Sequence, residues 1–200
     1  EGHAILATNK TAMLVHYYQR MYTSFIFRFY DGAKENIEKY LACIVDGGAN
    51  LFLAHAFHAF YIGLVSFWLA RKSREQEQGW CQRGKGSKLA LKKWTESSQW
   101  SFENKWYLLE AEESFCNHDY DMAKSYYEKA IASAKTHKFV HEEALAYELG
   151  AHFYLEQGET DKSVEYFLLA HERYQQWVSI KVDSFHMCFN LLLIIELILC

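Results

Sequence analysis

Histidine and acidic residues lie close together in the sequence at one place, where their spacing could support zinc chemistry. His137 and His141 are four residues apart, and Glu142 and Glu143 follow directly. His141 and Glu142 begin like the HExxH pattern of zinc proteases, but position 145 is Leu, so the second histidine ligand is missing. A zinc site needs at least three protein ligands, and no third ligand stands at a suitable spacing. We therefore expect core or surface histidines and no metal site.

His55 and His58 form a second histidine pair, inside the apolar run of residues 51–70. The same shortage of ligands favours a structural role for both side chains. A pocket near residues 51–70 that senses a small molecule or catalyses a reaction is the alternative function that the sequence leaves open. Loss of tight binding or turnover on replacing either histidine would favour it.

A glycine-rich segment imitates a phosphate-binding loop. Gly79, Gly84 and Lys85 match part of its spacing, but Gly86 stands where Ser or Thr would hold magnesium. No apolar strand precedes the segment, so we expect no nucleotide site. Residues 71–86 are polar and are predicted to form an insertion, as an exposed loop or a frayed helix end.

Four glutamates, Glu110, Glu112, Glu113 and Glu148, occupy similar places in two predicted helices. They would line an acidic groove or form a solvated face, and a solvated face is the commoner arrangement. No nucleophile, base and orienting residue can be assigned from the spacing. The sequence therefore predicts no catalytic residue and no cofactor.

Composition narrows the class of protein. Half of the 200 residues are hydrophobic and 17% are aromatic, so a sizeable core can form. The formal net charge of -4 argues against a nucleic-acid surface, which normally needs a basic stripe. The chain has no proline, which suits an array of helices better than a loop-rich or all-β fold.

The cysteines indicate a reducing compartment. There are five, none of them in a CxxC pair, and the odd number fits reduced thiols in the cytoplasm better than a disulfide framework. Cys43 and Cys116 lie on apolar helical patterns and are expected to be buried. Residues 1–10 lack the features of a signal peptide, and the first residue is Glu rather than Met, so we expect a piece of a longer chain.

The strongest helical pattern runs from Lys105 to Trp177. Apolar residues recur three and four positions apart in four segments, and the polar breaks between them fall at residues 117–119, 136–138 and 157–160. Residues 97–101 are predicted to form the turn that leads into this region.

A small–aromatic–small spacing occurs twice in this pattern, 40 residues apart, at Ala123, Tyr127, Ala130 and at Ser163, Phe167, Ala170. Small residues let two antiparallel helices approach closely, and the aromatic ring fills the space behind. This is the pattern of a tetratricopeptide-type helix pair, whose usual period is about 34 residues.

Extended to the whole chain, the pattern predicts an all-α fold, an antiparallel helix-hairpin (tetratricopeptide-like) α-solenoid over residues 1–185. The units span about residues 10–45, 50–97, 104–137 and 144–178. The first unit breaks at Tyr30-Asp31-Gly32, and Ala90 and Trp94 would lie on the second helix of the next unit.

Two apolar stretches are long enough to raise the question of a membrane. Residues 51–70 contain two histidines and several small residues, which favours a central helix buried on all sides over a membrane span. Residues 186–200 form an apolar tail, of which Leu191–Cys200 is too short to cross a bilayer. A truncated helix, a tail that touches a membrane and an effect of where the chain was cut are the alternatives, and we favour the truncated helix.

Several segments resemble the tetratricopeptide-like region of very large multi-domain signalling kinases: LKKW at residues 91–94, Lys105–Glu112, EALAYEL at residues 143–149 and HFYLEQG at residues 152–158. The resemblance covers about residues 45–185. In that family a protein-kinase-like domain and an AAA-type ATPase domain precede the helical region, and GAF or PAS modules and often a histidine-kinase module follow it. The resemblance implies a connecting and interaction region of a serine/threonine or histidine kinase. No catalytic residue carries over, because the ATP-binding and phosphotransfer motifs are not in this sequence.

The favoured function is a non-catalytic scaffold that binds protein partners or flanking domains, in signal transduction. Stacked helix pairs bury a continuous core and leave a concave surface for partners. The positions predicted to line such a partner-binding groove are Lys105, Leu108, Glu112, Leu145, Glu148 and His152. They do not reproduce the Lys/Asn clamp that binds acidic peptide tails. Nucleic acid and membrane are not expected among the partners.

Overall fold

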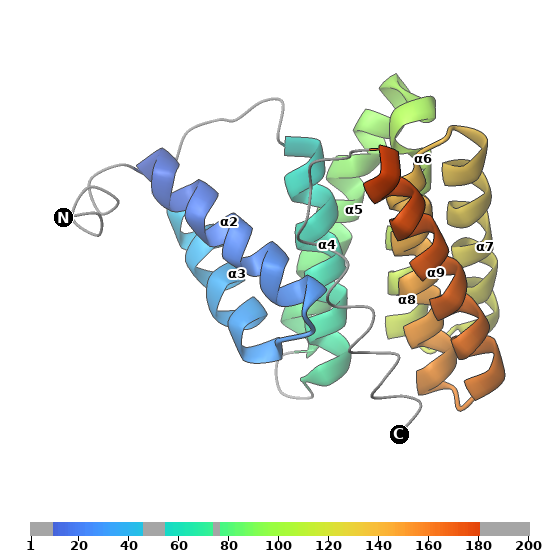
Figure 1. Cartoon of the computed structure of the whole chain (residues 1–200). Helices are drawn as coiled ribbons and strands as arrows, with labels where there is room; N and C mark the ends of the chain where they lie inside the picture. Colours follow the sequence, from blue (N-terminus) through green and yellow to red (C-terminus); the bar gives the residue numbers. More distant parts are fainter. Residues whose placement is uncertain (1–9, 46–54, 74–76, 181–200) are drawn as a thin grey trace. The chain divides into compact units, whose positions relative to one another are not determined.

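The structure, a computed structural model, describes residues 10–45, 55–73 and 77–180. The regular structure of these residues is entirely α-helical, which confirms the predicted all-α class. Its eight helices, labelled in Figure 1, are α2 (Lys10–Ile26), α3 (Tyr30–Val45), α4 (His55–Lys72), α5 (Glu77–Ser97), α6 (Gln99–Cys116), α7 (Tyr120–Thr136), α8 (Val140–Glu156) and α9 (Thr160–Ile180). The predicted tail, residues 186–200, lies outside the described residues.

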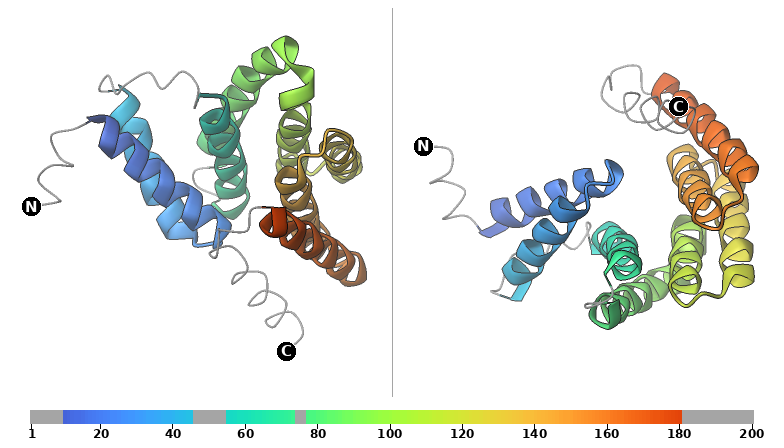
Figure 2. Two further views of the ribbon diagram at one scale, coloured as in Figure 1. Left: turned by 45° about the horizontal axis from the view of Figure 1, so that its top comes forward. Right: turned by 90° about the horizontal axis from the view of Figure 1, so that it is seen from below.

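The chain divides into two compact units, Glu1–Leu91 and Lys92–Cys200. In the first unit α2 pairs with α3, and both contact α4. In the second unit α6 pairs with α7 and α8 pairs with α9, while α8 also contacts α6 and α7. Figures 1 and 2 show these two pairs of the second unit side by side. The prediction of one array over residues 1–185 stays a prediction.

The same three-residue turn joins paired or successive helices at four places. The turns occupy residues 27–29, 117–119, 137–139 and 157–159. The middle residue of each turn has a positive φ, at Arg28, His118, Lys138 and Gly158. Only the last of these is a glycine, the residue that adopts this conformation without strain.

The hydrogen bonds of these turns follow one plan. In the turn after α6, the Asp119 N–H donates to the Ser114 carbonyl at 2.9 Å, and the His118 N–H donates to the Phe115 carbonyl at 3.1 Å. The other three turns repeat both bonds at the corresponding residues. This pairing is a Schellman motif, which satisfies the last carbonyls of a helix and reverses the chain. The polar breaks predicted at residues 117–119, 136–138 and 157–160 coincide with three of these turns.

The break predicted at Tyr30-Asp31-Gly32 is wrong, because α3 begins at Tyr30 and the turn occupies residues 27–29. Gly32 suggested a turn, but it is buried in the first part of α3. The ring of Phe29 covers it so closely that a Cβ at this position would overlap the ring. The glycine therefore permits a close approach rather than a reversal of the chain.

The small–aromatic–small contacts of the second unit are confirmed. Their members are all buried: Ala123, Tyr127, Ala130, Ser163, Phe167 and Ala170. The Ser163 hydroxyl also donates to the Ala151 carbonyl of α8 at 2.9 Å. These small side chains bring the second helix of each pair close to the first.

Helix α4 is buried on all sides over residues 60–70, as predicted for a central helix. Its Trp68 ring lies 5.8 Å from the Phe25 ring of α2 and 5.9 Å from the Tyr30 ring of α3, measured between centroids. In the described part of the chain, no helix combines the length and the apolar character that crossing a membrane requires.

Most of residues 71–86, predicted to form an exposed loop or a frayed helix end, lies in two helices. Helix α4 continues to Lys72 and α5 begins at Glu77. Gly84 is buried against α4, where a Cβ would lie 2.6 Å from the Phe67 ring. Ala90, expected to pack as Ala123 does, is exposed instead.

The two cysteines that were expected to be buried differ in their exposure to solvent. Cys116 is buried at the end of α6, and Cys43 in α3 is only half-buried.

Candidate interaction site at the first turn of α8

Two neighbouring glutamates in the first turn of α8 hold this helix to two different helices. Successive residues of an α-helix point about 100° apart, so Glu142 and Glu143 face different neighbours. The Glu142 Oε1 lies 2.9 Å from Nζ of Lys105 in α6. The Glu143 Oε1 lies 3.7 Å from Nε of Arg173 in α9. Glu142, the second residue of the partial zinc-protease motif, therefore joins α8 to α6.

Lys105 occupies the centre of this contact. Only 3% of its side chain is exposed. Its Nζ also donates to the Ser101 carbonyl at 3.3 Å and to Oδ1 of Asn104 at 3.4 Å, and it lies 5.0 Å from the centroid of the Phe139 ring. A buried ammonium group is tolerated only with such compensation, so these contacts fix α8 against α6.

The pKa values of the two glutamates move in opposite directions. Burial acts to raise the pKa of Glu142, but the charge of Lys105 and its hydrogen bond lower it, and the net pKa lies below the ordinary value. Burial raises the pKa of Glu143, and the charges of Arg173 and Lys135 offset only part of this effect. Adjacent carboxyl groups on one helix thus meet different electrostatic environments.

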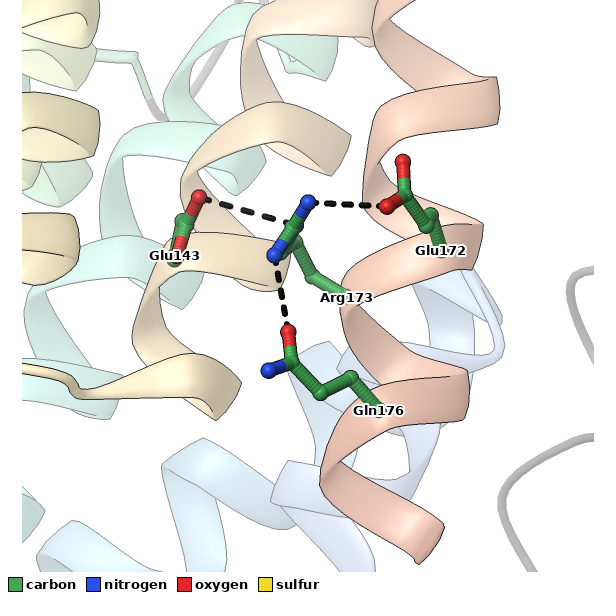
Figure 3. A network of polar contacts seen from close by, with 4 residues as sticks. All are labelled: Glu143, Glu172, Arg173 and Gln176. Carbon is green, nitrogen blue, oxygen red and sulfur yellow. Dashed lines mark hydrogen bonds and ion pairs between the residues drawn. The ribbon is translucent and has the colours of Figure 1, made fainter.

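Arg173 connects the buried and exposed parts of this cluster, as Figure 3 shows. Beside its contact with Glu143, its Nη2 lies 2.9 Å from Oε1 of Glu172, and its Nη1 donates to Oε1 of Gln176 at 2.7 Å. Glu143 is buried, whereas Glu172 and Gln176 are exposed. The guanidinium therefore lies at the edge of the pair formed by α8 and α9.

An accessible aromatic cluster lies next to the buried ion pair. We use the name Trp100 cluster for Trp100 of α6 with His137 and Phe139 of the turn before α8. The Trp100 ring centroid is 4.9 Å from that of Phe139 and 6.0 Å from that of His137. Trp100 is 58% exposed. Since Phe139 contacts both Trp100 and Lys105, the exposed ring is supported by the same residues that join α6 to α8.

The structure buries most of the residues predicted to line a partner groove. The buried ones are Lys105, Leu108, Glu112, Leu145 and Glu148, and His152 is half-buried. Glu112 accepts a hydrogen bond from the Tyr127 hydroxyl at 2.6 Å, and Glu148 accepts one from the Tyr174 hydroxyl at 2.8 Å. The solvated face expected for these two glutamates is therefore wrong. Lys105 joins α6 to α8, Glu112 and Glu148 join the helices of their own pairs, and His152 alone of the six is partly exposed.

Sequence reasoning missed the Trp100 cluster. Residues 97–101 were predicted to be a turn, and the structure places only Ser98 between α5 and α6. A tryptophan in or beside a short polar connection has few neighbours to cover it. That position, rather than any motif, could have indicated an exposed aromatic residue.

The histidines that suggested chemistry are used in packing. His137 lies in the turn before α8, and His141 lies in α8 with its ring centroid 4.9 Å from that of Trp177. His58 is buried, with its Nδ1 2.6 Å from the Tyr40 hydroxyl and its ring stacked on Tyr18. The side chain of His55 lies outside the described residues. Over residues 10–45, 55–73 and 77–180, no three His, Cys, Asp or Glu side chains are arranged to hold a metal ion.

The segment that imitates a phosphate-binding loop has the wrong geometry for one. Gly79 lies in the first turn of α5 and Gly84 and Lys85 lie about two turns after its start, so the segment is helical throughout and does not form a loop that leads into a helix N-terminus.

Comparison with protein-family models, with curated proteins and with solved structures found no match.

Proposed function

We propose that this chain is a non-catalytic helical scaffold, a tetratricopeptide-like α-solenoid that binds protein partners or neighbouring domains. The observation that carries the proposal is the Trp100 cluster, in which a largely exposed tryptophan lies beside the buried pair of Lys105 and Glu142. Tryptophan is enriched among the residues that dominate binding energy at interfaces. The fixed ion pair supports Trp100 through Phe139. This support lowers the conformational entropy cost of binding, because the side chain loses less motion when a partner binds.

The resemblance to the helical regions of large signalling kinases supplies the context. There the chain would connect a protein-kinase-like domain and an AAA-type ATPase domain to sensor modules, in the cytoplasm. The repeated turns and small-residue contacts support this proposal, because helical hairpins of that kind bury their apolar faces on one another and present side chains to partners. The partners are then proteins or flanking domains of the same chain.

The alternative, a small-molecule pocket near residues 51–70, has less support. The His58 side chain, which would have to act in such a pocket, is buried between Tyr18 and Tyr40. Residues 60–70 of α4 are buried by packing.

The test is a binding measurement with the purified modules encoded on either side of this segment. We expect Trp100→Ser to weaken binding about tenfold or more, as truncation of an interface hot spot does. Leu168→Ser is the matched control, because Leu168 is 54% exposed on α9 of the same unit and should bind as the wild type does. Equal losses in the two variants, or no binding by the wild type in either phosphorylation state of the modules, would contradict the proposal.

A further inference from the structure

A second exposed aromatic surface lies in the first unit, at the turn between α2 and α3. Phe27 is 56% exposed and Phe29 is 59% exposed. The ring of Phe29 lies on Gly32, so one face is supported by the backbone of α3 while the rest meets solvent. Large apolar side chains gathered at one exposed place on a protein surface commonly mark a binding site.

Arg28, between the two phenylalanines, is directed toward the core. Its guanidinium carbon lies 5.0 Å from the centroid of the Phe25 ring and 5.7 Å from that of the Trp68 ring of α4. Its φ of 54° belongs to the turn that reverses the chain. A cation is therefore held in place by two aromatic rings, beside two phenylalanines that are exposed.

Further cations belong to α4, whose Trp68 ring lies against rings on both sides of this turn, those of Phe25 and Tyr30. Arg71 and Lys72, in the last turn of α4, follow Trp68 by about one helical turn. They also suit the negative end of the α4 dipole, so they have a structural role as well. Asp31, in the first turn of α3, is the acidic residue nearest in sequence to this turn, and Glu75 follows Lys72 by three residues. We call Phe27, Phe29, Arg71 and Lys72 the basic aromatic tip.

The charge of the chain is divided unequally between the two units. Residues 1–91 contain eleven Lys and Arg against seven Asp and Glu, whereas residues 92–200 contain ten against eighteen. The first unit is thus positive although the whole chain has a formal charge of -4. A positive surface attracts acidic partners and raises their rate of association.

We propose that the basic aromatic tip binds an acidic protein segment that carries a large apolar side chain, as an acidic amphipathic helix does. The two phenylalanine rings supply apolar contact area, and Arg71 and Lys72 pair with carboxylates around it. A partner protein can have no acidic residue opposite the exposed Asp31. A continuous anionic lipid surface would place negative charge there and be repelled by it. The proposal does not depend on the Trp100 cluster, which belongs to the other unit.

The test is a selection of short peptides from a display library with the intact chain as the target. We expect the enriched peptides to be acidic and to contain Phe, Trp or Leu. Their affinity for the Phe27→Ser/Phe29→Ser variant should be about tenfold weaker, as expected for loss of central aromatic contacts. Their affinity for the Arg71→Gln/Lys72→Gln variant should fall at low salt and fall much less at high salt, where screening already suppresses the attraction.

Leu89→Ser is the matched control, because Leu89 is 61% exposed on α5 in the same unit and should leave peptide binding unchanged. All the substituted side chains except that of Arg71 are exposed, and circular dichroism and the unfolding midpoint verify that each variant folds. Enrichment of neutral or basic peptides, binding that both tip variants retain, or no enrichment at all would overturn the proposal. So would tip-dependent binding to vesicles of phosphatidylserine and phosphatidylcholine without binding to any acidic peptide.

Discussion

At the scale of single residues, side chains that look reactive are used to join helices. Glu142 and Glu143 contact cations on two different neighbouring helices, and the buried Lys105 is surrounded by oxygen atoms and an aromatic ring. Charged residues are mostly exposed in proteins, so a charged residue on a predicted helix is first assigned to the surface. Here that assignment fails because each buried charge has a partner on another helix.

The buried pair of Lys105 and Glu142 should respond unequally to loss of either member. Glu142→Leu leaves an ammonium group that is 3% exposed, whereas Lys105→Met leaves a carboxylate that is 17% exposed and keeps some hydration. We expect Glu142→Leu to lower the free energy of unfolding by about 3 kcal/mol or more. Lys105→Met should cost about 1 to 2 kcal/mol. Urea unfolding measures both, and the double variant should recover most of the loss. Equal losses in the single variants would show that the exposed fractions do not control the cost.

The two glutamates should also give opposite pH dependence. The pKa of Glu142 is lowered in the folded state, so its contribution to stability is complete above the unfolded value of 4.5 and is lost as the pH falls through the folded pKa. The pKa of Glu143 is raised in the folded state, so its contribution to stability is complete below pH 4.5, the unfolded pKa. That contribution is lost as the pH rises through the folded pKa.

Unfolding midpoints measured from acidic to neutral pH test this difference. The stability of the wild type relative to Glu142→Gln should increase with pH, and its stability relative to Glu143→Gln should decrease with pH. The same sign for both variants would contradict the assignment of their environments.

At the scale of helices, α5 is the clearest departure from the sequence prediction. We expect Gly84→Ala to destabilise the protein by about 1 to 3 kcal/mol, because the new Cβ would lie 2.6 Å from the Phe67 ring. Gly86→Ala, two residues away, has open space around its Cβ and should stabilise the helix by about 0.5 to 1 kcal/mol. Thermal unfolding compares the two variants. Stabilisation by both substitutions would show that α5 does not pack on α4 through Gly84.

The helices themselves were largely predictable, and their contacts only in part. The spacing of Ala123, Tyr127 and Ala130 predicted a packed face because small and aromatic residues have distinct roles between helices. Glycine misled the prediction at Gly32 and Gly84, since it was taken to mark turns and loops but lies under an aromatic ring in each case. Only a neighbouring helix decides between these roles, and a single sequence does not show which helix that is.

The candidate sites were hardly predictable, for a related reason. A groove was expected at buried positions, because helical spacing identifies a face of a helix but not what covers it. The exposed aromatic residues Trp100, Phe27 and Phe29 lie in or beside short turns, where periodicity carries no information. For Phe27 and Phe29 the exposure depends on a three-residue turn whose left-handed residue, Arg28, is not glycine, whereas Trp100 lies beside Ser98, the single residue that joins α5 to α6.

At the scale of the whole molecule, each unit presents an exposed aromatic surface in a different electrostatic setting. The Trp100 cluster belongs to a unit with an excess of acidic residues, and the basic aromatic tip belongs to a unit with an excess of basic residues. Charge complementarity controls partner choice and association rate more than affinity. The two surfaces would therefore select partners of opposite charge.

The second unit should fold without the first. Polar contacts between its helices, such as those of Glu112 with Tyr127, Glu148 with Tyr174 and Lys105 with Glu142, lie within residues 92–180. A segment of about 90 residues is large enough for an independent core and for cooperative unfolding. We expect the isolated segment to be helical by circular dichroism and to unfold in urea in one transition. Glu142→Leu should cost it the same free energy as in the full chain, because both members of the ion pair are present. A broad transition, or a different cost, would mean that residues before Lys92 are needed to complete this core.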